Sequence, residues 1–146
     1  MKLSKEITNG LIIFFGIALY FFFMKLIELE KLIYPRFLNI FIVYYGMSRT
    51  LKANKGQNRL GFGKNLFDII QTGLIGVVLS VVGLYVYIYY NGGQPFLDHL
   101  SQGYLSGKNP TVAEYCFAVF SEGIGSIVIL AFVTMQLLKY KSSDKI

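Results

Sequence analysis

The chain has 146 residues, enough for a single domain. Hydrophobic residues make up 54% of it and charged residues only 15%, with a mean hydropathy of +0.52, whereas soluble domains carry roughly 25% charged residues. This composition excludes an ordinary water-soluble globule and predicts an all-α integral membrane protein. The net charge of +6 does not indicate nucleic acid binding, because the basic residues lie between apolar runs, where lipid headgroups account for them.

The first part of the chain predicts two membrane spans. An apolar run predicts the first over residues 7–24, and no small-residue cleavage pattern follows it, so we expect it to stay uncleaved. The second is predicted over residues 32–48, around Pro35, which can begin a helix because its missing N–H is not needed there. This second span is the weakest, since it is short and contains Arg36 and Asn39.

Residues 49–65 are polar, bear glycine and contain no acidic residue, which is typical of a loop on the cytoplasmic side of a membrane. The basic side chains of this predicted cytoplasmic loop are expected to contact lipid headgroups or a cytoplasmic partner. They are Arg49, Lys52, Lys55, Arg59 and Lys64.

The third span is predicted over residues 66–90, because residues 69–90 contain no charge and are long enough to cross the ~30 Å bilayer core. Small residues recur along it with the three- and four-residue spacing of a heptad. We call this set the small-residue seam, and it comprises Gly73, Gly76, Ser80 and Gly83. Small residues allow two helices to approach closely in lipid. At the start of this span, Lys64 and Asp68 are one turn apart and predict an interfacial ion pair.

An outer loop is predicted over residues 91–113, with a short amphipathic helix on the membrane surface. The pattern from Thr111 to Glu114 is that of a capping box and marks the start of the fourth span, predicted over residues 114–138. Ser121 and Gly125 share a face of that span, so we expect spans three and four to pack together through their small residues.

Charge counting predicts the orientation. With both termini cytoplasmic, ten of the 14 Lys and Arg residues lie inside and four outside, which follows the positive-inside rule. The four outer residues are Lys25, Lys31, Arg36 and Lys108. The predicted fold is therefore a four-helix antiparallel bundle with an N-in, C-in topology.

Two stretches resemble a known family. They are GFGKNLFDIIQTGL (residues 61–74) and YIYYNGGQPFLDHL (residues 87–100), with Phe62 to Lys64 at the helix entry and Pro95 to Asp98 after the tyrosine-rich exit. With them the chain resembles domain-of-unknown-function family 4199, small bacterial membrane proteins with four predicted helices. The resemblance implies a multi-pass protein of the bacterial inner membrane, and it implies no catalytic residue.

Glu122 is the most informative single residue, because a carboxylate inside a span costs on the order of 2.5–3.5 kcal/mol unless it is paired, protonated or wetted. Arg36 and Asn39 enter the membrane from the same side, and Tyr87 can reach that level. One hypothesis is an outward-facing polar cluster of these four residues that binds a cation, a proton or a polar ligand. The other is a buried structural pair that sets helix register, and we favour it.

The sequence shows no nucleophile–base set and no metal-ligand spacing, so we expect no enzyme, no metal and no cofactor. The leading interpretation is a non-catalytic structural or accessory subunit. It would associate with lipid and with itself or another membrane protein through glycine-rich helix faces. The alternative is a small transporter or channel component that uses the cluster around Glu122.

Overall fold

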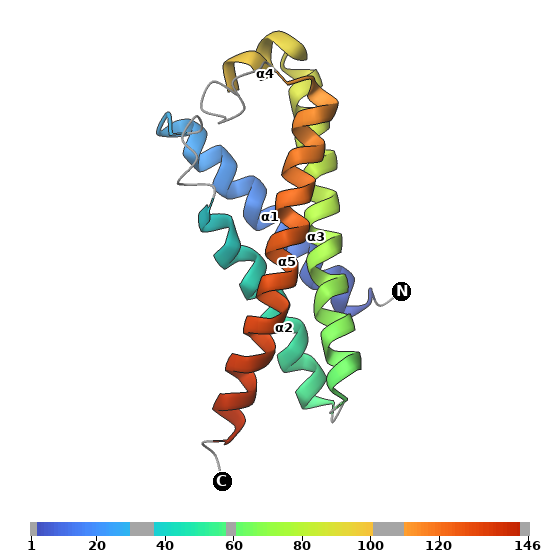
Figure 1. The fold of residues 1–146 in the computed structure, drawn as a ribbon. Helices are drawn as coiled ribbons and strands as arrows, with labels where there is room; N and C mark the ends of the chain where they lie inside the picture. The colour runs from blue at the N-terminus through green and yellow to red at the C-terminus, as the bar shows by residue number, and fades with distance from the viewer. Residues whose placement is uncertain (1–2, 30–36, 58–60, 101–109, 144–146) are drawn as a thin grey trace.

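The computed structural model describes residues 3–29, 37–57, 61–100 and 110–143, and these ranges contain helices and no strand. The helices are α1 (Lys5–Leu26), α2 (Asn39–Gly56), α3 (Phe62–Tyr90), α4 (Gln94–Leu100) and α5 (Val112–Ser143). In Figure 1, α4 lies at one end of the molecule, and the C-terminal end of α5 lies at the other. The predicted all-α class is confirmed.

Three helices are long and apolar enough to cross a membrane. They are α1, α3 and the Val112–Leu138 part of α5, with 22, 29 and 27 residues and a hydropathy of 2.1 each. The 18-residue helix α2 is not among them, because its second half carries Arg49, Lys52 and Lys55. Length and composition therefore support three of the four predicted spans.

The second helix lies further along the chain than the predicted span. It begins at Asn39 and continues to Gly56, past the predicted end at residue 48, while residues 30–36 lie outside the described part of the chain. The predicted loop over residues 49–65 is therefore wrong at both ends, since α2 occupies its first half and α3 begins at Phe62. The polar stretch stays helical because Thr50, Leu51 and Asn54 are buried in the protein.

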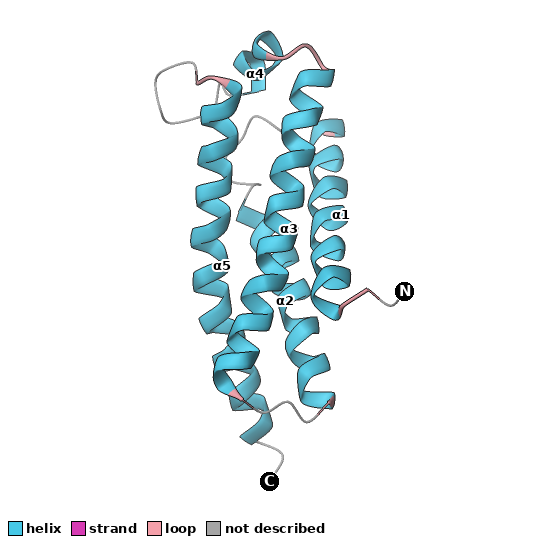
Figure 2. Ribbon diagram, turned by 90° about the vertical axis from the view of Figure 1, so that its right-hand side faces the viewer, coloured by secondary structure: helices cyan, strands magenta, loops and turns pink. Residues whose placement is uncertain are grey.

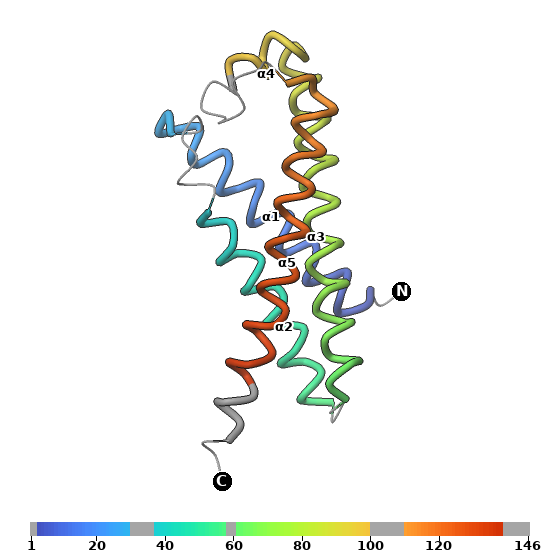
Figure 3. The backbone as a smooth tube through the Cα atoms, in the orientation of Figure 1, coloured from blue at the N-terminus to red at the C-terminus, as the bar shows by residue number. Residues whose placement is uncertain are grey.

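One hydrophobic core joins the four longer helices, and α3 packs against each of the other helices. Figure 2 shows α3 between α1 and α5, and Figure 3 shows α1 and α2 running obliquely to α3 and α5. The buried members of this core are Ile13, Val43, Met47, Leu51, Ile69, Val77, Ile127, Leu130 and Ala131. Packing of these side chains places the polar ends of α1, α2 and α3 together.

The connection between α3 and α5 contains the short helix expected there. Leu97 of α4 is fully buried in a second apolar cluster with Ile88 and Val112. The capping box before α5 is confirmed, because Thr111 N–H donates to Glu114 Oε2 at 2.8 Å and Glu114 N–H donates to Thr111 Oγ1 at 3.3 Å. Residues 101–109 lie outside the described ranges.

Candidate functional site

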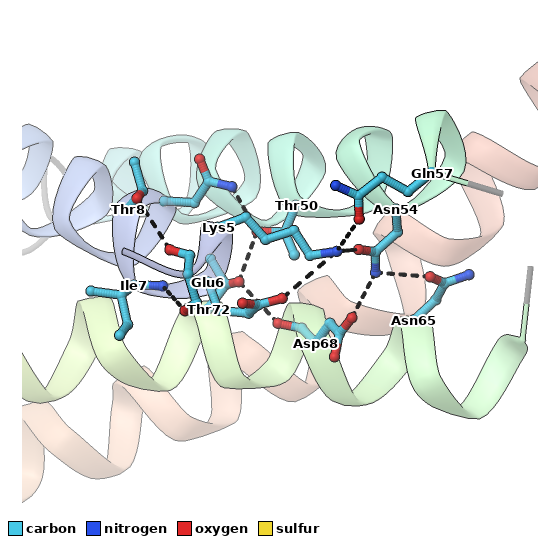
Figure 4. A network of polar contacts seen from close by, with 12 residues as sticks. Lys5, Glu6, Ile7, Thr8, Thr50, Asn54, Gln57, Asn65, Asp68 and Thr72 are labelled. Carbon is cyan, nitrogen blue, oxygen red and sulfur yellow. Dashed lines mark hydrogen bonds and ion pairs between the residues drawn. The ribbon is translucent and has the colours of Figure 1, made fainter. Parts of the chain in front are cut away.

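A buried polar network joins the N-terminal turns of α1, the second half of α2 and the first turns of α3. Figure 4 shows these side chains pointing toward one another from the three helices. Its six buried members are each at most 7% exposed, and they are Asn9, Thr50, Asn54, Asn65, Asp68 and Thr72. A buried polar group is costly unless it is hydrogen-bonded, so the partners of each atom decide what this network does.

Asn54 is the central residue of the first branch. Its Oδ1 accepts a hydrogen bond from Lys5 Nζ, and its Nδ2 donates to Asp68 Oδ2 and to Asn65 Oδ1, both at 2.9 Å. The amide dipole thus has its oxygen toward the ammonium and its nitrogen toward the carboxylate. Asn54 therefore stabilises both charges without bringing them into direct contact.

The second branch is a directional chain of hydrogen bonds. Arg49 Nε donates to Asn9 Oδ1 at 3.2 Å, and Asn9 Nδ2 donates to Thr50 Oγ1 at 2.9 Å. Thr72 Oγ1 donates to the Asp68 carbonyl at 2.9 Å. Its single proton is thereby used, so Thr50 is the donor in the 2.8 Å contact between Thr50 and Thr72. The chain runs from α2 through α1 and back to α2, and ends on α3.

This network is suited to fixing helix register. Its amides and hydroxyls hydrogen-bond across three helices, and a shift of one helix by a single residue would separate several donors from their acceptors. Within the described residues, no group of three or more His, Cys, Asp or Glu side chains gathers in a way that could hold a metal ion. The hydrogen bonds of the network link α1, α2 and α3, and an open space lies beside them.

An open cavity of about 800 Å³ lies between the start of α1 and the second half of α2, directly beside the network. Arg49 and Asn9 belong to both the cavity wall and the network. The lining residues are Leu3, Ser4, Lys5, Glu6, Thr8, Asn9, Arg49, Lys52, Ala53 and Gln57. This wall combines three cationic side chains with one carboxylate, so it is positively charged overall.

The basic residues of the predicted loop have different surroundings. Arg49, Lys52 and Lys64 are exposed, and the first two line the cavity. Lys55 is half-buried and donates to the Leu138 carbonyl of α5 at 2.6 Å, so it ties α2 to α5. Arg59 lies outside the described residues.

The predicted pairing of Lys64 with Asp68 is not what the structure shows. Asp68 is buried and accepts from Asn54 of α2, while Lys64 is exposed. Both residues are near the start of α3, but the buried amide of α2 packs closer to the carboxylate than the lysine one turn away. The packing of α2 on α3 decides this contact.

The small-residue seam of α3 packs against two helices, α5 and α1, and not against α5 alone. A Cβ placed on Gly73 would lie 2.9 Å from Ile127 of α5, as predicted, whereas one on Gly76 would lie 2.5 Å from Ile13 of α1. Gly83 faces Phe14 of α1, and Ser80 Oγ donates to the Gly76 carbonyl of its own helix at 2.7 Å. Each residue turns an α-helix by about 100°, so Gly73 is rotated about 60° from Gly76 and meets another helix.

The predicted packing face of α5 is wrong. Ser121 is exposed and donates to the Phe117 carbonyl at 2.9 Å, and a Cβ on Gly125 would meet no atom within 4 Å. Gly123 makes the close contact instead, since its Cβ would lie 2.6 Å from Val77 of α3. Gly123 and Gly125 are about 200° apart around the helix, so only one of them can face α3.

The cluster predicted around Glu122 stays a prediction. Glu122 is exposed on α5, about 100° around the helix from Gly123, the residue that faces α3. Asn39 is half-buried at the first turn of α2, and Arg36 lies outside the described residues.

Tyr87 belongs to a different group. Its hydroxyl accepts from Lys25 Nζ at 2.6 Å, and its ring packs edge-on against Phe21 and Phe22 of α1 and Phe96 of α4. It therefore joins α3 to the C-terminal end of α1 and to α4.

Sequence reasoning missed Asn9, Thr50, Asn54 and Asn65 as a group. A signal was present, since Thr50, Asn54 and Gln57 recur at helical spacing, as do Asn65, Asp68 and Thr72. Assigning residues 49–65 to a loop concealed that periodicity.

Comparison of the chain with protein-family models, with curated proteins and with solved structures found no match in any of the three. The resemblance to domain-of-unknown-function family 4199 stays a prediction.

Proposed function

We propose that this chain is a multi-pass protein of the bacterial inner membrane that acts as a non-catalytic structural or accessory subunit. Its four longer helices would form an antiparallel bundle with both termini in the cytoplasm. Its partners would be the lipid bilayer and either a second copy or another membrane protein.

The observation that carries this proposal is the exposed apolar surface of the three long helices. Only 22%, 28% and 22% of the residues in the apolar windows of α1, α3 and α5 are buried within the chain. Large side chains such as Phe15, Phe22 and Phe117 are at least half exposed. A surface of this kind requires lipid or a partner, because monomeric soluble proteins rarely expose large contiguous apolar patches.

The polar groups of the core support a structural role. Thr50, Asn54 and Thr72 are fully buried and hydrogen-bond between helices, as polar side chains do when they hold membrane helices together. The basic residues around them gather at one end of α2 and α3, and this distribution favours a cytoplasmic location for that end.

Cysteine labelling tests the topology. Cys116 is the chain's single cysteine and is buried, so Cys116→Ala gives a background for single-cysteine variants. Exposed positions lie at or near the ends of the helices, and the variants are Ser4→Cys, Glu28→Cys, Gln57→Cys, Lys64→Cys and His99→Cys. A membrane-impermeant maleimide should label the positions at 28 and 99 on intact cells, and those at 4, 57 and 64 only after permeabilisation. The reverse pattern would refute the orientation, and labelling of 28 and 57 from one side would refute a crossing by α2.

Native mass spectrometry tests the association. Extracted in a mild detergent, the protein should be found as an oligomer or together with another membrane protein. A strict monomer without a copurifying partner, both in detergent and after cross-linking in the membrane, would contradict the accessory role.

A further inference from the structure

The cavity beside the polar network contains two cations that the described part of the chain does not neutralise. Arg49 donates from Nε to Asn9 and from a terminal nitrogen to the Tyr45 hydroxyl at 3.4 Å. A guanidinium has five N–H donors, so three remain for a ligand. Lys52 is exposed, and no residue of the described ranges accepts a hydrogen bond or forms an ion pair with it.

The remaining charges of the cavity do not cancel these two. Glu6 is its acidic lining residue, and its carboxylate lies 3.9 Å from Lys5 Nζ, which also contacts Asn54 and Gln57. Lys5 and Glu6 thus balance each other on the α1 side. Arg49 and Lys52 are three residues apart on α2 and therefore lie on one face, which gives the α2 side a net charge of plus two.

Arg49 is held in place before any ligand arrives. Asn9, which accepts from its Nε, is only 5% exposed and is itself fixed by Thr50. The guanidinium carbon lies 5.9 Å from the centre of the Tyr45 ring. A planar, oriented guanidinium matches the oxygens of a phosphate in a bidentate arrangement, and little side-chain freedom remains to be lost on binding.

The cavity lies at the level where α3 enters the apolar layer. The 29 residues of α3 extend about 43 Å, which exceeds the ~30 Å core of a bilayer. The excess is at the Phe62 end, because residues 69–90 contain no charge. Asn54 follows the cavity residue Ala53 and bonds Asp68, one residue before that uncharged stretch begins. The cavity therefore opens at headgroup depth.

We propose that this cavity binds a phosphate group, with Arg49 and Lys52 as its ligands. The chemistry is shared by the headgroup of an anionic phospholipid and by a small soluble phosphate, and the volume of about 800 Å³ admits either. The headgroup depth rests on the membrane placement proposed above. The positive charge of the cavity wall does not depend on that placement, because it follows from the folded chain alone.

Native mass spectrometry of the full chain in detergent, titrated with phosphatidylglycerol, measures the affinity of the first bound lipid. Lys52→Gln should weaken it by about tenfold, the loss expected for one charge-assisted hydrogen bond. Lys64→Gln is the matched control. It removes the same charge from an exposed lysine at the same end of the molecule, but one that does not line the cavity, so it should change the affinity less than about twofold.

Arg49→Lys provides a second test, because it keeps the charge and removes the planar fork. It should also weaken the first lipid, by about tenfold. Circular dichroism and membrane fractionation of each variant report folding and insertion separately, so a failure of the site is distinguishable from a failure of the membrane assignment.

Competition identifies the source of the phosphate. If inorganic phosphate displaces the first phosphatidylglycerol, the site takes a soluble phosphate; if it does not, and the lipid still depends on Lys52, the site takes a headgroup. Either result supports the proposal. Equal effects of Lys52→Gln and Lys64→Gln, or no effect of either, would overturn it, since binding would then reflect general charge.

Discussion

Replacing Asn54 with alanine tests whether the buried network holds the helices together. The substitution removes the amide that accepts from Lys5 and donates to Asp68 and Asn65. Asn54 is fully buried, so little water reaches the partners that remain. Two of the three lost hydrogen bonds involve a charged group, and these are the bonds whose loss costs most.

The expected cost follows from these contacts. A hydrogen bond to a charged group contributes about 1.5–3 kcal/mol and a neutral one about 1 kcal/mol. Lys5 keeps its contacts with Gln57 and Glu6, which reduces the loss on that side. We therefore expect Asn54→Ala to lower the free energy of unfolding by about 3–5 kcal/mol, a large part of the stability of a small protein.

Unfolding followed by helical circular dichroism in one detergent measures this change. The matched control is Gln57→Ala. Gln57 lies three residues further along the chain, directly after α2, is exposed and contacts Lys5 at 3.4 Å, so the change should cost less than about 0.5 kcal/mol. Combining Asn54→Ala with Asp68→Ala should cost less than the sum of the two single changes, because they share a contact. A loss below about 1 kcal/mol for Asn54→Ala, or one no larger than that of the control, would refute the network as a determinant of stability.

Four further substitutions are measured by the same unfolding experiment. Gly123→Ala should destabilise the protein by about 1–2 kcal/mol because its Cβ would meet Val77, whereas Gly125→Ala, with open space around it, should stabilise by about 0.5–1 kcal/mol; similar effects of the two would contradict the packing of α5 on α3. Glu28→Gly should stabilise by about 1 kcal/mol, because residue 28 closes α1 at a φ of 55°, and an unchanged stability would count against that helix end. Thr111→Ala should cost about 1 kcal/mol through loss of the N-cap bond, and a neutral result would exclude the capping box in solution.

Part of the fold followed from local properties of the chain. The three apolar helices were expected from uncharged runs long enough to cross a bilayer, because the free energy of transferring a segment into lipid depends mainly on its own residues. The capping box from Thr111 to Glu114 was expected for a similar reason, since both partners lie within one turn. The short helix α4 also has its pattern within a few residues.

The faces of the helices were not determined in this way. Gly73 and Gly76 belong to one heptad pattern, yet they meet α5 and α1 respectively. The pattern of small residues shows that another helix can approach α3 closely, but it does not determine which helix packs there. On α5 the pattern selected Gly125 over Gly123, because nothing local distinguishes two glycines on nearly opposite faces of one helix.

The amino-acid sequence by itself determined that the chain is helical and that three of its helices suit a bilayer, since length and apolar content act within each segment. Only the tertiary structure decided that a stretch resembling a polar loop is helix, and that Asn9 meets Thr50 across 41 positions. Burial against α1 and α3 makes an unpaired amide or hydroxyl costly there, and helices from distant parts of the chain supply the partners.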